Sequence, residues 1–569
     1  MTATVHSVGG QKSRPPAQSP ERADGDIARQ DPNKAVLAFL VAVAVLVTAF
    51  KFPPLLDYPN HYARLWLLSG GIAQAPFPEI YTLGWNSAFT NVGIDLMARW
   101  LGPVLGVSLL ARLLLFLAIV LPPLGAIALH QRLFGGAYHW QIAMLSLAWC
   151  ATMIGGFINF QIGLGMALLF AAADWRMQQK NRRLGLFFFR LVAALLLTVM
   201  HLFSVGFYLA LVFGLEFSAD FSSALRQWRS LALRLVLAVV TCAIPPLLLY
   251  LQAPVLPRGS EAGLDASWNN SPALVVMNLL SAIWTYVALV DLVFLIPILL
   301  VCYHAVRTRH LRLHAGLSIT ALGLLVIACV CPRHMMGTGW VSWRFPIMAA
   351  LAAMVMICPL PNLRRRQALL LAAVLVIAVF GRTAWIGYVW WQGAADAADV
   401  EAVLADVPPG SAILPLQHRN DANPLAHIQR HFAWGQDTFR HLPTLGVPDA
   451  HAFVPTLFAA RGKQPLTVLP PWSGIAVAEG NLLSTGLLLC PTWLRQDTAN
   501  TPYLDRWRER FDMVLVVNAD VPDQYVGDAM PSGLTLVSQR PFARLYRIDK
   551  SATSAAQPVV CPDPLPPIE

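Results

Sequence analysis

Four side chains that can take part in acid–base or ion-binding chemistry lie close together near the start of the chain. The stretch "FPPLLDYPNHYAR" carries Asp57, Asn60, His61 and Arg64 within eight positions. A carboxylate can accept a proton, a neutral imidazole can donate or accept a hydrogen bond, and a guanidinium can bind an anion. Prolines in the same stretch restrict the backbone, and a helix starting there carries Arg64 one or two turns beyond Asp57. The pattern indicates a site rather than a solvated linker.

Further polar side chains fall at the same membrane depth as Asp57 when the apolar runs are taken as membrane spans. "GGFINFQIG" places Asn159 at a turn between two apolar runs, and "VMHLFSVGF" places His201 at the next such turn. A later loop, "CPRHMMGTGWVSWRFP", adds a basic cluster. Helix–helix hydrogen bonding by Asn159 and His201, and snorkelling of the arginines to lipid head groups, are the ordinary alternatives. The candidate binding residues are His61, Arg64, Asn159, His201, Arg333, His334 and Arg344, and the candidate catalytic residue is Asp57.

One acid and several cations at a single membrane surface suit a lipid-linked phosphate as substrate. Such a molecule needs an apolar flank for its tail and cations for its phosphate oxygens, which arginine binds by charge-assisted and often bidentate hydrogen bonds. It also needs a base that takes a proton from the attacking acceptor, and Asp57 is the predicted base.

The composition indicates an integral membrane protein. Of the 569 residues, 56% are hydrophobic and only 13% are charged, and the mean hydropathy is +0.55. The formal charge of +10 is concentrated in short basic clusters between apolar runs, where lysine and arginine set topology. A nucleic-acid partner is therefore not predicted, and the bilayer is.

Apolar runs of roughly the 17 to 25 residues that a spanning helix needs recur along the chain. Counting them so that the basic clusters stay on one side predicts eleven spans. These are 35–52, 108–130, 140–155, 157–176, 185–200, 202–218, 231–252, 284–304, 312–331, 344–360 and 367–391. The short segment 92–106 contains two charges and is predicted to be an amphipathic helix at the membrane interface.

These patterns predict three regions. Residues 1–34 form a polar, disordered cytoplasmic tail, 35–391 a transmembrane domain that includes a long outer loop at 53–107, and 392–569 an outer, periplasmic α/β domain. The strands expected in the α/β domain are 411–416, 511–520 and a hairpin of 534–539 with 543–548, and 396–407 and 501–511 have helical spacing. No phosphate-binding loop, nucleophile elbow or metal motif is visible in that domain. Whether its two cysteines, Cys490 and Cys561, are bonded is left open.

The arrangement resembles the C superfamily of membrane glycosyltransferases (GT-C). The resemblance rests on a first span followed by an acidic motif in a long outer loop, on "LGPVLGVSLLARLLL" closing that loop, on the span count and on the C-terminal domain. "DYPNHYAR", "GFINFQIGLG", "HLF" and "WRFP" are similar to a little-characterised bacterial branch. The resemblance implies a polyprenyl-phosphate or polyprenyl-diphosphate sugar as donor, Asp57 as the essential loop acid, and Arg333, His334 or Arg344 as phosphate cations. Many members have two adjacent acids, whereas Asp57 stands alone, so neither a metal nor another cofactor is expected.

The predicted function is transfer of a sugar from a polyprenyl-linked donor to an unidentified acceptor at the periplasmic face of the bacterial inner membrane. The outer domain is expected to cover the pocket or select the acceptor. A lipid or glycan transporter, a non-catalytic assembly protein, and a degenerate enzyme that only scaffolds the outer domain remain as alternatives. A transporter is expected to place its polar cavity around the deeper Asp291, whereas a transferase is expected to line one cavity with Asp57, Arg333 and Arg344.

Overall fold

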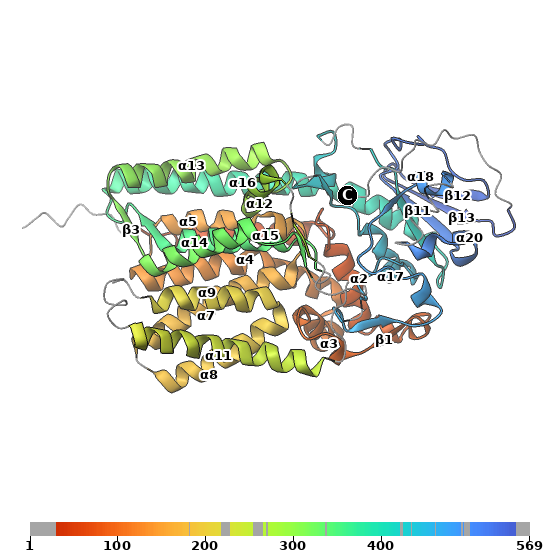
Figure 1. Cartoon of the computed structure of the whole chain (residues 1–569). Helices are drawn as coiled ribbons and strands as arrows, with labels where there is room; N and C mark the ends of the chain where they lie inside the picture. The colour runs from red at the N-terminus through yellow and green to blue at the C-terminus, as the bar shows by residue number, and fades with distance from the viewer. Residues whose placement is uncertain are drawn as a thin grey trace, which may run out of the picture.

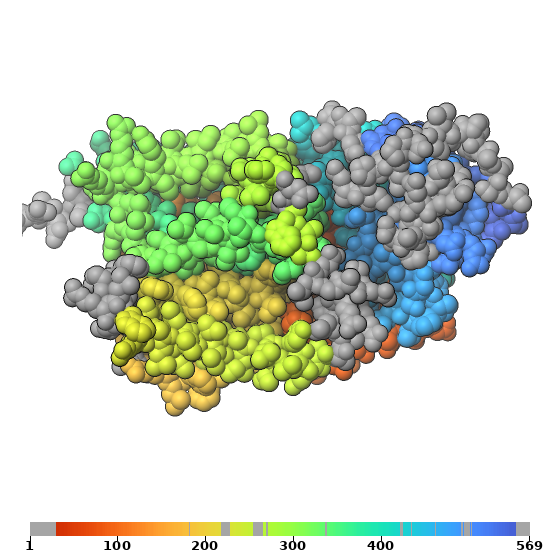
Figure 2. Space-filling model, viewed as in Figure 1, coloured from red at the N-terminus to blue at the C-terminus, as the bar shows by residue number. Residues whose placement is uncertain are grey.

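The protein has two parts, an elongated bundle of helices and a C-terminal region built around a sheet (Figure 1). The computed structural model describes residues 30–180, 182–217, 228–253, 266–268, 271–335, 338–420, 425–433, 435–460, 462–490, 493 and 501–552. The C-terminal region, blue in Figure 2, lies against one end of the bundle.

The helices of the bundle overlap the eleven predicted spans, and the predicted span 140–155 contains two short α-helices instead of one. They are α1 (Asn33–Ala49), α4 (Val107–Phe134), α5 (Trp140–Met144) with α6 (Ala151–Ile154), α7 (Ile158–Gln179), α8 (Arg183–Met200), α9 (Leu202–Glu216), α11 (Trp228–Gln252), α13 (Ala288–Arg307), α14 (Ala315–Val330), α15 (Val341–Met356) and α16 (Arg365–Leu404). Six helices of the described chain, α4, α7, α8, α11, α13 and α16, are long and apolar enough to cross a membrane. The chain is a helical membrane protein, and the count of eleven spans stays a prediction.

The segment between α11 and α13, predicted as an outer loop, contains a further helix, α12 (Pro272–Leu279). The side chain of Ser271 accepts a hydrogen bond from the backbone N–H of Ala273, and Pro272 occupies the first turn. A serine N-cap followed by proline is a strong helix start. The prediction missed this helix because eight residues are too few to show a periodic pattern.

Helix α16 runs unbroken from the bundle into the C-terminal region (Figure 1). The predicted domain boundary between 391 and 392 lies inside it, and the predicted helices 367–391 and 396–407 merge into this one element. Gly393, close to the predicted boundary, is helical and approaches Pro54 so closely that an added Cβ would lie 2.8 Å from the proline Cγ. Because no proline interrupts the run, the helix continues, and Arg430 of the C-terminal region binds Asp396 near its end at 2.9 Å.

The outer loop folds over the end of the bundle as two helices, α2 (Tyr58–Leu68) and α3 (Gly93–Leu105). Helix α3 corresponds to the predicted amphipathic helix. Its Trp100 and Val104 side chains are 76% and 82% exposed. An outward apolar face is what a helix lying in a membrane interface requires.

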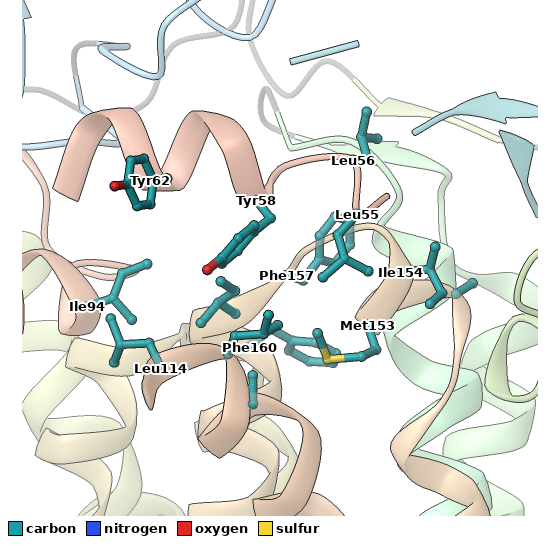
Figure 3. Close-up of a cluster of buried hydrophobic side chains, with 14 of the residues drawn as sticks. Leu55, Leu56, Tyr58, Tyr62, Ile94, Leu114, Met153, Ile154, Phe157 and Phe160 are labelled. Atoms are coloured by element: carbon teal, nitrogen blue, oxygen red, sulfur yellow. The ribbon is translucent and has the colours of Figure 1, made fainter. Parts of the chain in front are cut away.

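Helix α2 lies across the bundle and is held by apolar contacts (Figure 3). The ring of Tyr58 points down from α2 toward the helices beneath, and Leu55, just before α2, lies beside Phe157 and Ile154. Tyr58, Leu55 and Ile154 are at most 1% exposed. Burying these side chains fixes the segment that carries Asp57 to the end of the bundle.

The C-terminal region contains a five-stranded mixed sheet in the order β10-β6-β11-β13-β12. The strands are β10 (Leu483–Ser484), β6 (Ile413–Gln417), β11 (Met513–Val517), β13 (Ala543–Ile548) and β12 (Leu534–Gln539). Strand β11 is parallel to β6, and β12 and β13 form the predicted antiparallel hairpin. The predicted α/β architecture and its strands are therefore confirmed. The predicted helix 501–511 is not formed as one element, because only α20 (Trp507–Arg510) is α-helical there and Arg506 before it is left-handed.

Short helices and two-stranded ribbons complete the fold. Helices α17 (Gly446–Ala450) and α18 (Gly486–Leu489) belong to the C-terminal region, and the ribbons are β1 (Tyr81–Leu83) with β9 (Leu466–Val468), β2 (Ala266–Ser267) with β4 (His334–Met335), β3 (Leu311–Leu313) with β5 (Ile357–Pro359), and β7 (His431–Phe432) with β8 (Gln436–Asp437). The β1–β9 pair joins the outer loop to the C-terminal region directly. The two parts are thus connected by main-chain hydrogen bonds as well as by α16.

Residues 1–29 of the predicted tail lie outside the described residues, but its last five residues are ordered. Gln30 is buried, its side-chain amide donates to the carbonyl oxygens of Leu360 and Pro361, and its side-chain oxygen accepts from the N–H of His139. The predicted boundary at residue 34 is therefore too late. Cys490 is disulfide-bonded, whereas Cys561 lies outside the described residues.

Candidate functional site

A cavity of about 860 Å³ lies where the outer loop, the ends of bundle helices and the C-terminal region meet. The lining includes all eight predicted site residues: Asp57, His61, Arg64, Asn159, His201, Arg333, His334 and Arg344. The C-terminal region contributes Gln436, Arg440, His441, Phe458, Lys463, Gln464, Glu479 and Asn481. The cavity is therefore formed jointly by the two parts of the protein.

Asp57 immediately precedes α2, at the N-cap position, yet its side chain does not cap the helix. Aspartate at this position usually accepts a hydrogen bond from the backbone of the first turn. Here the side chain is 15% exposed, and Oδ1 lies 3.5 Å from Nε2 of His441. The carboxylate is thus left available to the cavity rather than being used by its own helix.

The backbone around Asp57 is held by the turn between α6 and α7. The N–H of Leu56 donates to the carbonyl oxygen of Ile154 at 3.0 Å, and the N–H of Asp57 donates to that of Gly155 at 3.2 Å. Gly156 has a φ of +81°, and a Cβ placed on it would lie 2.9 Å from the Asp57 nitrogen. Glycine is needed there both for the backbone conformation and for the close approach.

Burial raises the pKa of Asp57 to about 8. The nearby Glu479 carboxylate raises this pKa further, whereas the guanidinium groups of Arg440, Arg344 and Arg64 lower it. A carboxyl group is normally ionised far below neutrality, so this shift brings its proton affinity close to physiological pH. That is the range in which a general base is most effective.

Arg344 brings a positive charge to the cavity from the first turn of α15. Its Nη1 donates to the carbonyl oxygens of Gly339 and Trp340 at 2.8 and 2.9 Å, and its guanidinium carbon lies 4.9 Å from the ring centre of Phe157 and 5.2 Å from that of Phe203. Within the described chain, no carboxylate lies within 4 Å of it, and its Nε is buried without a partner. The charge is held rigidly but is not neutralised by an ion pair.

Arg440 brings a second such charge from the C-terminal region. Its Nη2 donates to the side-chain oxygen of Gln436 at 3.3 Å, and no ion pair within 4 Å forms with any described carboxylate. Burial lowers the pKa of this guanidinium. Lys463, by contrast, is paired with Glu479. An anion that entered the cavity would find two guanidinium groups without carboxylate partners, one from each part of the protein.

Two histidines of the cavity are positioned by local contacts. The Nδ1 of His201 accepts a hydrogen bond from the N–H of Phe203 at 3.3 Å and thereby caps α9. A neutral His201 therefore carries its proton on Nε2, as a donor. His61 is 6% exposed, and its ring meets that of Phe458 edge-on with centroids 5.4 Å apart. Burial, together with the positive charge of Arg64, holds the pKa of His61 well below its usual value, so His61 is neutral.

Two predicted binding residues make structural contacts. Arg64 is fully buried and forms a bidentate ion pair with Asp95, through Nε at 2.8 Å and Nη2 at 3.3 Å, which leaves Nη1 buried without a partner. Asn159 accepts a hydrogen bond from the N–H of Ile94 and donates to the carbonyl and side-chain oxygens of Asn91, each at 3.0 Å. The Arg64–Asp95 pair therefore joins α2 to α3 within the outer loop. Asn159 of α7 ties the outer loop to the bundle, so its side chain has the structural hydrogen-bonding role that was the alternative to substrate binding.

The remaining two predicted residues are less enclosed. Arg333 is exposed, and its N–H donates to the carbonyl oxygen of Ser267 at 2.8 Å. His334 begins β4 and is half-buried. Both residues line the cavity from β4 and the position immediately before it.

Sequence reasoning missed Arg440 and His441, which come from "FRHLP" in the C-terminal region. An adjacent arginine and histidine followed by an apolar residue and proline was the available signal, but such a pair is common on protein surfaces. Only its burial against Asn60 and Asp57 distinguishes it, with His441 being 3% exposed.

The chemistry that these groups can perform is anion binding combined with proton transfer. The described part of the chain contains no group of three or more histidine, cysteine, aspartate or glutamate side chains placed to hold a metal ion. Its cavity instead offers guanidinium and imidazole donors beside one carboxylate of raised pKa. Guanidinium groups are well suited to phosphate oxygens.

Comparison with known proteins adds a likeness in fold. No family model matches the chain, and no curated protein sequence matches it significantly. Among solved structures, it is similar to ArnT from Cupriavidus metallidurans, crystallised in the apo state, with 14% sequence identity and a TM-score of 0.47 over 92% of this chain and 99% of that chain. Because identity and TM-score are this low, the chemistry of the cavity has to be judged from its own residues.

Proposed function

We propose that this protein is a membrane glycosyltransferase that moves a sugar from a polyprenyl-phosphate or polyprenyl-diphosphate donor to an acceptor. The observation that carries the proposal is the shared cavity, in which Asp57 and the guanidinium groups of Arg344 and Arg440 line one volume of about 860 Å³. A carboxylate of raised pKa beside unpaired guanidinium groups supports proton abstraction coupled to departure of a phosphate.

The walls of the cavity fit the two ends of such a donor. The aromatic rings of Phe160 and Phe203 flank Arg344, and Leu202 of the bundle lines the same cavity. Amide and charged side chains from the C-terminal region, including Gln464 and Asn481, line the cavity as well. The lipid phosphate would bind beside Arg344, with its sugar toward the C-terminal region.

The proposed reaction begins with Asp57 ionised. Its carboxylate takes the proton of the acceptor hydroxyl as the hydroxyl oxygen forms a bond to the anomeric carbon of the donor sugar. The bond between that carbon and the phosphate oxygen breaks, and the electron pair leaves with the phosphate. Arg344, Arg440 and the Nε2–H of His201 would stabilise the extra negative charge. The products are the glycosylated acceptor, a polyprenyl phosphate or diphosphate and a protonated Asp57.

The transporter alternative is less well supported. Asp291, the acid on which it rests, is absent from the cavity lining and is 2% exposed. Its carboxylate forms an ion pair with Arg382 at 2.9 Å and accepts hydrogen bonds from the N–H and hydroxyl of Thr285. Because its acceptor positions are occupied within the protein, Asp291 acts as a connection between α13 and α16.

The proposal also places the protein in a bacterial inner membrane with the C-terminal region in the periplasm. Two features support this orientation. The basic clusters lie at the opposite ends of the predicted spans, and Cys490 of the C-terminal region is disulfide-bonded, which suits an oxidising compartment.

Binding of the lipid phosphate can be tested without knowledge of the sugar. Purified protein in nanodiscs would be titrated with a polyprenyl monophosphate, and the matching polyprenol, which lacks the phosphate, would serve as the control. We expect the phosphate to bind at least tenfold more tightly, since each charge-assisted hydrogen bond contributes about 1.5 to 3 kcal/mol. Equal binding of the two lipids would contradict the proposal.

Catalysis is tested by Asp57→Asn, which keeps the shape of the side chain and removes its basicity. Deletion cells complemented with wild type or variant would be compared by mass spectrometry of envelope lipids and glycans. Loss of general-base catalysis typically costs about 10² to 10⁴ in rate, so we expect the modification to be lost while phosphate binding is retained. Asp505→Asn, which makes the same change on an exposed side chain of the C-terminal region, is the matched control. Full modification by Asp57→Asn would rule out the proposed base.

A further inference from the structure

The C-terminal region places one imidazole directly against the carboxylate of Asp57. His441 precedes the short 3-10 helix Leu442–Leu445, and its Nε2 lies 3.5 Å from Oδ1 of Asp57. Its ring also meets that of Phe458, with centroids 5.0 Å apart. His441 is 3% exposed, so its ring is held in place by protein on all sides except toward the cavity.

The tautomer of His441 follows from the contacts of Asn60, which is fully buried. The side-chain oxygen of Asn60 accepts a hydrogen bond from the N–H of Phe458 at 2.7 Å, and its Nδ2 donates to the carbonyl oxygen of Thr456 at 2.9 Å. Rotating the amide by half a turn would set donor against donor and acceptor against acceptor. The orientation of the amide is therefore fixed by the backbone.

With Nδ2 oriented in this way, Asn60 presents a donor to Nδ1 of His441 at 3.1 Å. Nδ1 must accept, so a neutral ring carries its proton on Nε2, facing Asp57. Burial, together with the charge of Arg440, lowers the pKa of His441 to about 3, which keeps the ring neutral. Asn60, His441 and Asp57 thus form a chain of contacts with one defined direction of donation.

We propose that His441 is a positioning residue for Asp57, which directs its Nε2–H at Oδ1 so that the other carboxylate oxygen faces the acceptor hydroxyl. The role of Asp57 as base rests on the function proposed for this cavity, whereas the contact between His441 and Asp57 does not. The separation of 3.5 Å between Nε2 and Oδ1 is long for a hydrogen bond. Catalytic hydrogen bonds are often this long in free enzymes and tighten only in the substrate complex. The C-terminal region would then contribute directly to catalysis rather than only cover the site.

Two amide substitutions of His441 test its contact with Asp57 separately from its contact with Asn60. In His441→Gln the side-chain amide nitrogen can reach the position of Nε2 and donate to Asp57. In His441→Asn the shorter side chain reaches only the position of Nδ1, so it keeps the contact with Asn60 and loses the one with Asp57. His441→Phe, which preserves packing against Phe458, is the second variant that lacks the donor, should His441→Asn fail to fold.

The first measurement does not depend on sugar transfer. The difference in thermal stability between each His441 variant and its double variant with Asp57→Asn, followed against pH, reports the pKa of Asp57 in the folded protein. The charged groups around Asp57 are unchanged in this comparison: Arg64, Arg344, Arg440 and Glu479. His61 is buried and neutral. We expect the pKa to rise by about one unit in His441→Asn and His441→Phe but to stay within a few tenths in His441→Gln, because only the former two lose a donor to the charged form.

The second measurement uses the transfer reaction itself. A misdirected base lowers kcat by about tenfold to a hundredfold with little effect on KM, so we expect this loss in His441→Asn and recovery in His441→Gln. If the pKa of Asp57 shifts as expected but no sugar transfer is detected, the contact between His441 and Asp57 is supported and the proposed function is refuted. Equal pKa values and equal kcat in the Gln and Asn variants would overturn the role of His441 while leaving the transferase standing.

Discussion

Gly156 packs directly against Asp57: a Cβ added to the glycine would lie 2.9 Å from the Asp57 nitrogen and 3.0 Å from its Cβ. The acid is thus positioned by the turn between α6 and α7, roughly one hundred residues away along the chain. The carbonyl oxygen of the neighbouring Gly155 also accepts the hydrogen bond from the Asp57 N–H. The turn therefore fixes both the position and the orientation of Asp57.

We therefore expect Gly156→Ala to displace Asp57 and to lower kcat by at least tenfold, since a misplacement of about 1 Å can cost 10² in rate. The added methyl group has no room, and the φ of +81° is unfavourable for alanine. Gly206→Ala in α9 is the control, because nothing lies within 4 Å of a Cβ there. The hypothesis fails if both variants keep wild-type turnover.

The raised pKa of Asp57 predicts a pH dependence of activity. As a base, Asp57 must be deprotonated, so kcat/KM should increase with pH and reach half of its plateau near pH 8. The acidic limb should be absent from the residual activity of Asp57→Asn. A profile that is flat between pH 5 and 9 would show that no group with this pKa governs the reaction.

The same shift predicts a pH dependence of stability. The folded pKa of about 8 exceeds the ordinary value of 3.8, so between these values the folded state binds more protons than the unfolded state. Stability should therefore fall as pH rises through this window. Asp57→Asn lacks this loss, and its Tm should exceed that of wild type by a margin that grows from pH 5 to pH 8. Asp505→Asn, in which the affected side chain is exposed, should show no such trend in a thermal scan.

Phosphate binding should depend on the guanidinium group of Arg344 and not only on its positive charge. Its guanidinium group donates to two backbone carbonyls and lies among aromatic rings, an arrangement that a lysine ammonium cannot reproduce. We expect Arg344→Lys to weaken binding of a polyprenyl monophosphate by at least tenfold. Arg366→Lys, on an exposed side chain at the start of α16, should bind as wild type does. Unchanged binding by Arg344→Lys would remove Arg344 from the phosphate site.

The buried pair of Arg64 and Asp95 should matter for folding. Removing one partner leaves an uncompensated buried charge, which typically costs about 3 to 5 kcal/mol. We expect Asp95→Ala to lower the Tm more than the double variant Arg64→Met with Asp95→Leu, which removes both charges. Thermal unfolding of both variants in nanodiscs of the same lipid measures the two Tm values. A double variant less stable than Asp95→Ala would show that the charges contribute more than their burial costs.

Much of the cavity follows from local pattern. Span length fixes where an apolar run reaches the membrane surface, so polar residues at the ends of such runs lie at one depth. For this reason Asp57, His201 and Arg344 could be assigned to one surface from their positions alone. The strands of the C-terminal region were equally predictable from their apolar runs, whereas the extent of α16 was not, because a change in composition at residue 391 resembles a boundary even within one helix.

No local sequence pattern could predict which side chains of the site contact one another. Arg64 could have faced either a phosphate or another side chain, and its pairing with Asp95 depends on how the outer loop folds back on itself. Asn60 and His441 meet at 3.1 Å although they are 381 positions apart. Local periodicity indicates where each residue lies in its own helix or turn. It therefore predicts the membrane depth and the chemical type of the candidate groups. Only the docking of the C-terminal region onto the bundle, driven by burial of side chains from both parts, decides which of those groups touch.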